Sequence, residues 1–271
     1  MNQFTLSRPL PGYLRATFDR PPLNLLDSDT ISELADIAGI METDPDLCVV
    51  LFDSVNPDFF WARYDLSSTP PDPATPFAGL YAFAEVAARI SDSPVVSIAS
   101  IRGRARGGGS ELALACDLRF ASLENALLGQ PEVPSGLLPG GGGIERLTAL
   151  VGRARAAEIV VTGDDYDAAT AERYGWINRA IPDDQLDAFV DRMARRIASF
   201  DRTAVAVAKR LIARHTRPAD SDLAETIASL PAVATATQPR RATLRERAAE
   251  VGADFELRLG HHLGPTSPER G

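Results

Sequence analysis

Apolar and polar positions change their period along this chain. In the first half, short β-rich apolar runs predict a hairpin of strands at about 3–7 and 12–19, then strands at CVVLFD, PVVSIASI and DLRFAS. Between them, a helical period predicts helices from Ser28 to about Glu42, at about 77–91 and at SELALAC. Because strands and helices alternate, we expect an α/β core with parallel strands and a ligand site beyond their carboxyl ends.

The second half has a different character. From Ile144 to Leu230 the pattern predicts nearly continuous alanine-rich helix, broken at Gly163, around 175–182 and at Pro218. The last forty residues are charged and helical, and we expect arginines there to face two glutamates: Arg240, Arg241, Arg245 and Arg247 facing Glu246 and Glu250. We therefore predict a core over 1–198 and a helical region over 199–271 that serves oligomerisation or as a lid.

Composition narrows the class of protein. With 271 residues, 45% hydrophobic and 24% charged, the chain is typical of a globular protein with one main domain. Cys48 and Cys116 have no disulfide or metal-ligand spacing, and the N-terminus lacks a secretion signal, so we expect a cytoplasmic protein. No apolar run approaches the length of a membrane span.

The net charge of the chain bears on whether it binds nucleic acid. The net charge of −9 argues against sequence-independent binding to nucleic acid, which needs a basic face to displace counterions. It does not exclude a compact anionic ligand. The proline-rich stretch SSTPPDPATP predicts an exposed loop of the kind that covers binding sites.

A triple glycine, Gly107 to Gly109, lies between the strand PVVSIASI and the helix SELALAC. Such a turn leaves backbone N–H groups unpaired at a helix start, where they attract negative charge, and Gly108 offers one such donor. A turn that needs glycine only for close packing is an equal alternative. The pattern GRARGGG matches neither the Rossmann nor the Walker motif.

Two glutamates flank the segment after this turn. Glu111 falls in the first turn of the predicted helix, where a carboxylate also caps free N–H groups. Glu132 lies between Pro131 and Pro134, so it projects from a constrained loop, and its simplest role is a solvated charge. Both could instead converge with the Gly108 donor on one pocket.

The segments IASIRGRARGGGSELALACDLRFAS and GQPEVPSGLLPGGGGIERL resemble the central signature of the crotonase, or enoyl-CoA hydratase/isomerase, superfamily. The resemblance extends more loosely to most of the chain, and it implies a ββα-repeat spiral core with a helical C-terminal region. It also implies an acyl-coenzyme A substrate, no further cofactor, no metal, and a homotrimer or a dimer of trimers.

By this resemblance, the backbone N–H groups of Tyr64 and Gly108 form the oxyanion hole for the thioester oxygen, and Glu111 and Glu132 are the catalytic residues. The family more usually has a glycine and a small residue where this chain has Arg63 and Tyr64. The resemblance further implies five substrate-binding residues: Ala62, Asp65, Leu66, Pro139 and Gly140.

The reaction implied is addition of water to the α,β double bond of an enoyl thioester. Glu111 would handle the water and Glu132 the proton at Cα, with one pKa of the pair raised by the other carboxylate. Two alternatives stay open: a double-bond isomerase of the same superfamily, and a noncatalytic acyl-CoA-binding oligomer.

Other charged residues are weaker candidates. For Arg102, Arg104 and Arg106, surface solvation or a subunit salt bridge is favoured over contact with the coenzyme phosphates. Lys209, the only lysine, is interpreted as a helix-surface charge. We expect no role for the three histidines, His215, His261 and His262.

Overall fold

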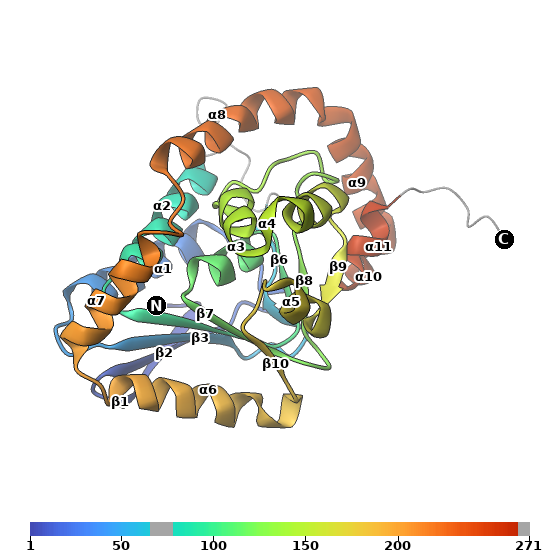
Figure 1. Cartoon of the computed structure of the whole chain (residues 1–271). Helices are drawn as coiled ribbons and strands as arrows, with labels where there is room; N and C mark the ends of the chain where they lie inside the picture. Colours follow the sequence, from blue (N-terminus) through green and yellow to red (C-terminus); the bar gives the residue numbers. More distant parts are fainter. Residues whose placement is uncertain (66–77, 265–271) are drawn as a thin grey trace.

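The structure, a computed structural model, describes residues 1–65 and 78–264. Its larger sheet has six strands in the order β1-β2-β3-β5-β7-β10, antiparallel between β1 and β2 and parallel elsewhere (Figure 1). The strands are β1 (Phe4–Leu10), β2 (Tyr13–Phe18), β3 (Val49–Ser54), β5 (Val96–Ile101), β7 (Leu118–Ser122) and β10 (Arg179–Ile181).

A smaller sheet has the order β4-β6-β8-β9. Its strands have three residues each: β4 (Phe59–Trp61), β6 (Arg104–Arg106), β8 (Leu127–Gly129) and β9 (Asp165–Asp167). After the N-terminal hairpin, β4, β6 and β8 each follow a strand of the larger sheet and precede a helix. The chain therefore repeats a ββα unit, which confirms the predicted α/β spiral core.

Helices cover both faces of the larger sheet. On one side lie α1 (Ser28–Thr43), α2 (Ala78–Asp92), α3 (Gly108–Ala115), α4 (Gly143–Thr162) and α5 (Ala168–Tyr174), and on the other α6 (Asp183–Ala198) (Figure 1). In β3, Val50 and Phe52 face the first layer, whereas Val49 and Leu51 face α6. A strand buried on both faces reads as a continuous apolar run, which is why CVVLFD stood out in the sequence.

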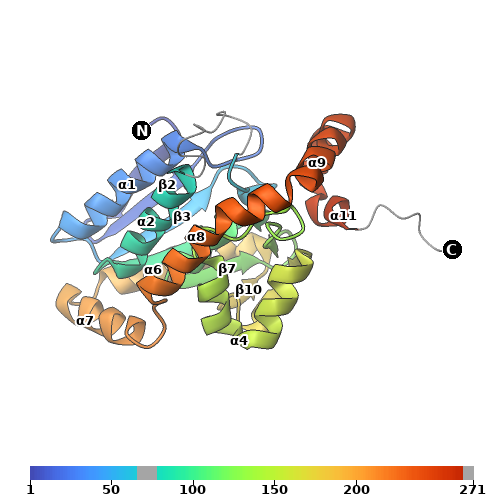
Figure 2. The ribbon, with the colours of Figure 1, turned by 90° about the horizontal axis from the view of Figure 1, so that it is seen from above.

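The C-terminal helices extend away from α6 and pass across the other side of the core. They are α7 (Arg202–Ala213), α8 (Asp220–Ala236), α9 (Gln238–Val251), α10 (Ala253–Leu257) and α11 (Leu259–Leu263). Figure 2 shows α8 crossing the molecule and α9 to α11 at one end. The division into 1–198 and 199–271 remains a prediction. Within the described residues, no helix has the length and apolarity to span a bilayer.

The short strands are the main difference from the pattern-based prediction. We expected Arg104–Arg106 to belong to a turn, but these residues form β6, which pairs with β4 and β8. Three residues are too few to show an alternation of apolar and polar positions. The proline-rich loop lies outside the described residues.

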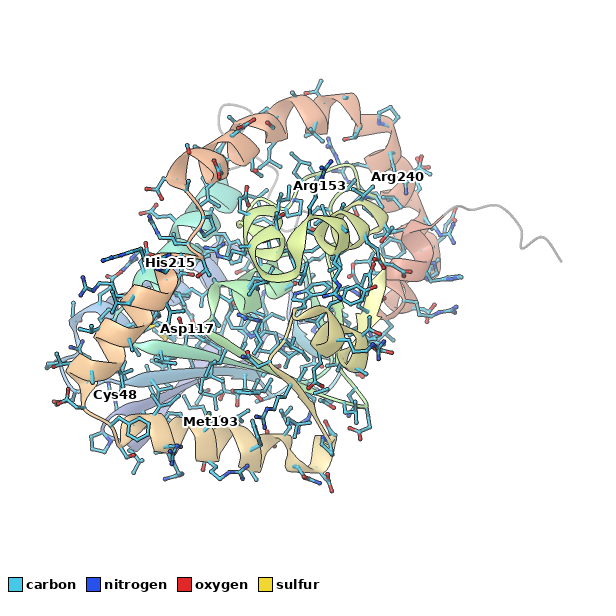
Figure 3. All side chains as sticks on the ribbon, in the orientation of Figure 1. Cys48, Asp117, Arg153, Met193, His215 and Arg240 are labelled. Carbon is cyan, nitrogen blue, oxygen red and sulfur yellow. The ribbon has the colours of Figure 1, made fainter. Side chains whose placement is uncertain are left out.

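Lys209 corrects a second prediction, because it is buried and not a surface charge. Its Nζ lies 2.8 Å from Asp117 Oδ2 and donates to the carbonyl oxygens of Val95, at 2.7 Å, and Ile90, at 3.3 Å. Asp117, labelled in Figure 3 where α7 faces the sheet, also accepts from the Ser97 backbone and hydroxyl. The aliphatic stem of lysine lets a residue of α7 carry its charge to the sheet.

We expect Lys209→Met to lower the free energy of unfolding by about 2–3 kcal/mol, because it leaves Asp117 without its cation and two carbonyl groups without a donor. Urea unfolding would measure the loss. The control is Arg210→Met, which removes an exposed charge from the next position of α7. Equal stability of the two variants would contradict a structural role for the Lys209–Asp117 pair.

Candidate active site

A cavity of about 200 Å³ lies where the triple-glycine turn, the Glu132 loop, α2 and the C-terminal helices meet. Gly108, Glu111, Glu132 and Tyr64 all line it, so the structure brings together the four residues assigned to chemistry. Most of its remaining surface is apolar. The C-terminal helices contribute Leu244, Ala248, Phe255, Leu259 and Leu263.

The triple-glycine turn places α3 directly against the segment after β4. Gly107 has a φ of +50°, and a Cβ on Gly109 would lie 1.9 Å from the Trp61 carbonyl oxygen. The Gly109 N–H donates to the Ala62 carbonyl at 3.0 Å. Close packing and helix-start donors are therefore both properties of this turn.

The backbones of Tyr64 and Gly108 lie close together at the wall of the cavity. A Cβ on Gly108 would lie 3.6 Å from the Tyr64 nitrogen. Within the described part of the chain, neither the Tyr64 N–H nor the Gly108 N–H donates to another residue. Leu26 and Phe83 lie 3.7 and 3.8 Å from the same Cβ position, so the surroundings are apolar. Two free donors in such a place favour an oxygen that carries negative charge.

The Tyr64 side chain points toward the start of α2, where a Cβ on Gly79 would lie only 2.0 Å from the tyrosine hydroxyl oxygen. Glycine at 79 therefore makes room for the tyrosine side chain, because any Cβ there would overlap the hydroxyl group. Next to it, Arg63 donates to Glu256 of α10 at 2.6 Å and to the Tyr64 carbonyl at 3.1 Å. The Arg63 side chain thus ties the Tyr64 loop to the C-terminal helices.

Glu111 is buried, and a turn distant in sequence holds its carboxylate. Its Oε1 accepts from the Gly141 N–H at 2.7 Å and the Gly143 N–H at 2.9 Å. Both bonds fall on one oxygen, so within the described residues Oε2 has no donor. The two N–H bonds to Oε1 therefore fix the orientation of the Glu111 carboxylate, and Oε2 stays available to accept a hydrogen bond from a ligand.

Glu132 lies in a tight turn in which Ser135 N–H bonds Pro131 O and Leu137 N–H bonds Glu132 O. Part of the residue is exposed, but the carboxylate end is not. Oε1 lies 2.7 Å from where a Cβ on Gly107 would be, and Oε2 is buried with no partner in the described structure. A buried carboxylate oxygen without a partner is energetically unfavourable and marks a functional site.

The two carboxyl groups disturb each other. Burial, opposed by the Gly143 and Gly141 N–H groups, raises the pKa of Glu111 to about 7. Burial and the nearby Glu111 charge raise the pKa of Glu132 well above its ordinary value. The pair therefore resists carrying two negative charges, and Glu132, which lacks the two backbone donors that Glu111 has, more strongly favours its protonated form.

The residues assigned to substrate binding are distributed unevenly. Gly140 lines the cavity, and Pro139 packs against Gly143 in the turn that holds Glu111. Ala62 and Asp65 are buried beside the Tyr64 loop and do not line the cavity, and Asp65 lies 3.6 Å from Arg20. Leu66 lies outside the described residues.

The arginines near the turn form contacts within the chain. Arg102 pairs with Asp183 at 2.9 Å, and Arg106 pairs with Asp165 at 2.6 Å. Arg104 donates to the Leu257 carbonyl at 2.8 Å. Their positive charges therefore serve the fold and the attachment of α10.

Arg146 is a residue that the sequence analysis missed. It is 6% exposed, it donates to the Gly141 carbonyl at 2.6 Å, and its charge favours ionised Glu111. Gly141 connects the two side chains, because its N–H bonds Glu111. A signal was present: a cation in the first turn of a helix opposes the helix dipole, so Arg146 in GGGGIERL needed an explanation.

The raised pKa of Glu111 predicts how the stability of the folded protein changes with pH. An unfolded glutamate ionises near 4.5 and folded Glu111 near 7, so between these values the folded state binds more protons and stability falls as pH rises. Glu111→Gln keeps both N–H bonds and removes this loss. We expect its stability relative to wild type to rise by on the order of 2 kcal/mol from pH 5 to pH 8. Denaturant unfolding across this range would measure it, and Glu246→Gln, which removes an exposed carboxylate of α9, should show no such rise.

The charge of Arg146 leads to a separate prediction about the pKa of Glu111. Removing its charge in Arg146→Met should raise the pKa of Glu111 above about 7, because a nearby cation favours the carboxylate. Arg146→Lys keeps the charge and should show a smaller rise. Infrared titration of the carboxyl band, assigned by its loss in Glu111→Gln, measures both. An unchanged titration in Arg146→Met would show that Arg146 supports only the fold.

The comparisons with known proteins agree with this geometry. Residues 12–242 match the family model described as enoyl-CoA hydratase/isomerase. A probable enoyl-CoA hydratase of Mycobacterium leprae is 34% identical over 79% of this chain and 82% of its own length. A short-chain-enoyl-CoA hydratase of Clostridium acetobutylicum is 34% identical over 73% of this chain and 76% of its own.

Solved structures extend the similarity over nearly the whole chain. A crystal structure of a protein from Streptomyces avermitilis has a TM-score of 0.90 and 39% identity, and the match covers 98% of each chain. An enoyl-CoA hydratase/isomerase from Xanthobacter autotrophicus has a TM-score of 0.84 and 26% identity over 97% of this chain and 99% of its own. With sequence, fold and the arrangement of Glu111, Glu132 and Gly108 in agreement, this chain belongs to the enoyl-CoA hydratase/isomerase family.

Proposed function

We propose that this protein is an enzyme that adds water across the α,β double bond of an acyl-CoA thioester. The observation that carries the proposal is the pair Glu111 and Glu132, which lines one cavity together with the N–H groups of Tyr64 and Gly108. The hydratase names of the relatives support it.

The two N–H groups would bind the thioester oxygen. Attack of water at Cβ moves negative charge onto that oxygen, so fixed donors stabilise the transition state more than the ground state. The apolar neighbours Leu26 and Phe83 strengthen this interaction, because they lower the local dielectric.

The two glutamates would divide the proton transfers. Ionised Glu111 accepts a proton from water as the water oxygen bonds Cβ, and protonated Glu132 gives its proton to Cα. This division agrees with the surroundings of the two groups, since two backbone N–H groups favour ionised Glu111, whereas burial and the Glu111 charge raise the pKa of Glu132. The overall change is addition of H and OH to the double bond.

The proposal includes further points. Hydration is redox-neutral: the water oxygen keeps one proton as the product hydroxyl, Glu132 gives a proton to Cα, and the proton that Glu111 takes from water restores the pair for the next cycle. We therefore expect no cofactor beyond the coenzyme A of the substrate. We also propose, from family resemblance, a cytoplasmic homotrimer or dimer of trimers that acts in fatty acyl metabolism, with the C-terminal helices as its lid or oligomerisation region.

The test is hydration of crotonyl-CoA, followed by loss of the enone absorbance. We expect Glu111→Gln and Glu132→Gln each to lower kcat by about 10²- to 10⁴-fold, the usual contribution of a positioned acid or base. Glu246→Gln should leave kcat unchanged, which controls for loss of a negative charge.

Other outcomes select the alternatives. Conversion of 3-enoyl-CoA without hydration of 2-enoyl-CoA would identify an isomerase. Tight acyl-CoA binding without turnover on any acyl chain would identify a binding protein. Full activity in both glutamine variants would contradict the mechanism.

A further inference from the structure

Two arginines of α9, Arg241 and Arg245, line the same cavity as the glutamates. From the sequence, we expected the arginines of this helix to face Glu246 and Glu250. That prediction is wrong, because within the described residues no arginine of α9 pairs with either glutamate. Two positive charges therefore line the cavity, and no carboxylate of the described residues pairs with them.

The neighbouring Arg240, labelled in Figure 3, shows what a structural arginine of this helix does. Its guanidinium donates to the Pro134 carbonyl and, at 2.8 Å, to the Leu263 carbonyl. Arg241 makes only longer contacts, 3.4 Å to Gly136 O and 3.3 Å to Thr237 Oγ1, and Arg245 has no partner in the described structure. Both α9 arginines that line the cavity thus have donors to spare, as does Arg247, which does not line it and contacts His262 Nδ1 at 3.4 Å.

The two guanidinium groups are close enough to affect each other. Burial and the charge of Arg245 both lower the pKa of Arg241. An arginine remains charged under such an influence, so the pair is a concentration of positive charge beside an apolar cavity. An anion between the two would relieve this repulsion and could accept bidentate bonds.

The position of this charge indicates which part of an acyl-CoA it faces. Arg241 contacts Gly136, in the turn that carries Glu132. The cation beside the oxyanion donors is Arg63, and Glu256 already neutralises it at 2.6 Å. The two cations therefore lie on the Glu132 side of the cavity. If the thioester oxygen lies at Tyr64 and Gly108 and Cα at Glu132, as in the proposed function, the acyl chain continues toward this side.

We propose that the cavity accepts 2-enoyl-CoA thioesters whose acyl chain ends in a carboxylate, which Arg241 and Arg245 bind. The inference rests on the proposed function for its kinetic readout. The apolar lining contributed by Leu80, Leu137 and Leu244 accommodates the methylene groups between the double bond and that carboxylate.

The kinetic test compares 2-enoyl-CoAs of five, six and eight acyl carbons that end in a carboxylate with the same thioesters ending in a neutral amide. At the best length, we expect wild type to prefer the carboxylate by about 10- to 100-fold in kcat/KM, the equivalent of one charge-assisted hydrogen bond. Arg241→Gln and Arg245→Gln should each lower this ratio, which cancels any effect of the substitution on the Glu132 turn that both substrates share.

The control is Arg153→Gln, which removes an exposed arginine of α4 that does not line the cavity (Figure 3). This variant should keep the wild-type ratio. A wild-type preference for the amide, or a ratio that no α9 variant changes, would overturn the proposal.

The coenzyme phosphates are the other source of negative charge. If they are the true partner, Arg241→Gln will weaken carboxylate and amide substrates equally, and the loss will shrink with 3′-dephospho-CoA thioesters. That result would also overturn the proposal.

A binding test separates this inference from the proposed reaction. Saturated adipyl-CoA and its terminal amide cannot be hydrated, so calorimetry with these ligands reports the anion site alone. Tighter binding of adipyl-CoA, lost in Arg241→Gln, would support the site even in a protein without hydratase activity. Equal binding of the two ligands by wild type would refute it even if crotonyl-CoA is hydrated.

Discussion

The active site depends on one constraint: a glutamate buried in an apolar core must have donors for its carboxylate. For Glu111 these donors are the N–H groups of Gly141 and Gly143, about thirty residues further along the chain. A side chain at Gly141 would lie 2.5 Å from the Phe83 ring and 2.9 Å from Glu111 Oε2, so only glycine allows the turn to come this close. Arg146 then donates to the Gly141 carbonyl. The glycine-rich segment before α4 is therefore part of the site.

The same requirement explains why the two glutamates of the site differ in their tendency to hold a proton. Backbone donors offset part of the burial of Glu111, whereas Glu132 Oε2 is buried with no partner among the residues that the structure describes, and the Glu111 charge raises the pKa of Glu132. Removing one charge relieves the repulsion, and the acid with fewer donors keeps its proton. Such a pair destabilises the folded protein at neutral pH, as expected where function and stability conflict.

The sequence predicted the parts of the fold that local chemistry determines. The helix from Ser28 has a capping box on Asp27, and β3 is an apolar run, so both were visible. Strands of three residues such as β6 were not, because pairing with β4 and β8 defines them. Similarly, motif and resemblance identified Glu111, Glu132 and Gly108. They could not show that Lys209 is buried, that Arg146 supports Glu111, or that the C-terminal helices line the cavity, because these contacts join segments far apart in sequence.

The contacts of the C-terminal helices show that the cavity is completed by tertiary structure that forms around the core. Glu256 bonds Arg63 beside the Tyr64 donor, and Arg240 bonds the Pro134 carbonyl in the loop that carries Glu132. The helices thus contact the two loops that carry an oxyanion donor and an acid. A shift of α9 or α10 would move one of these loops relative to Glu111, which the core holds in place. Acyl-chain specificity and the geometry of the chemical step are therefore coupled, because the helices that line the cavity also support the Tyr64 and Glu132 loops.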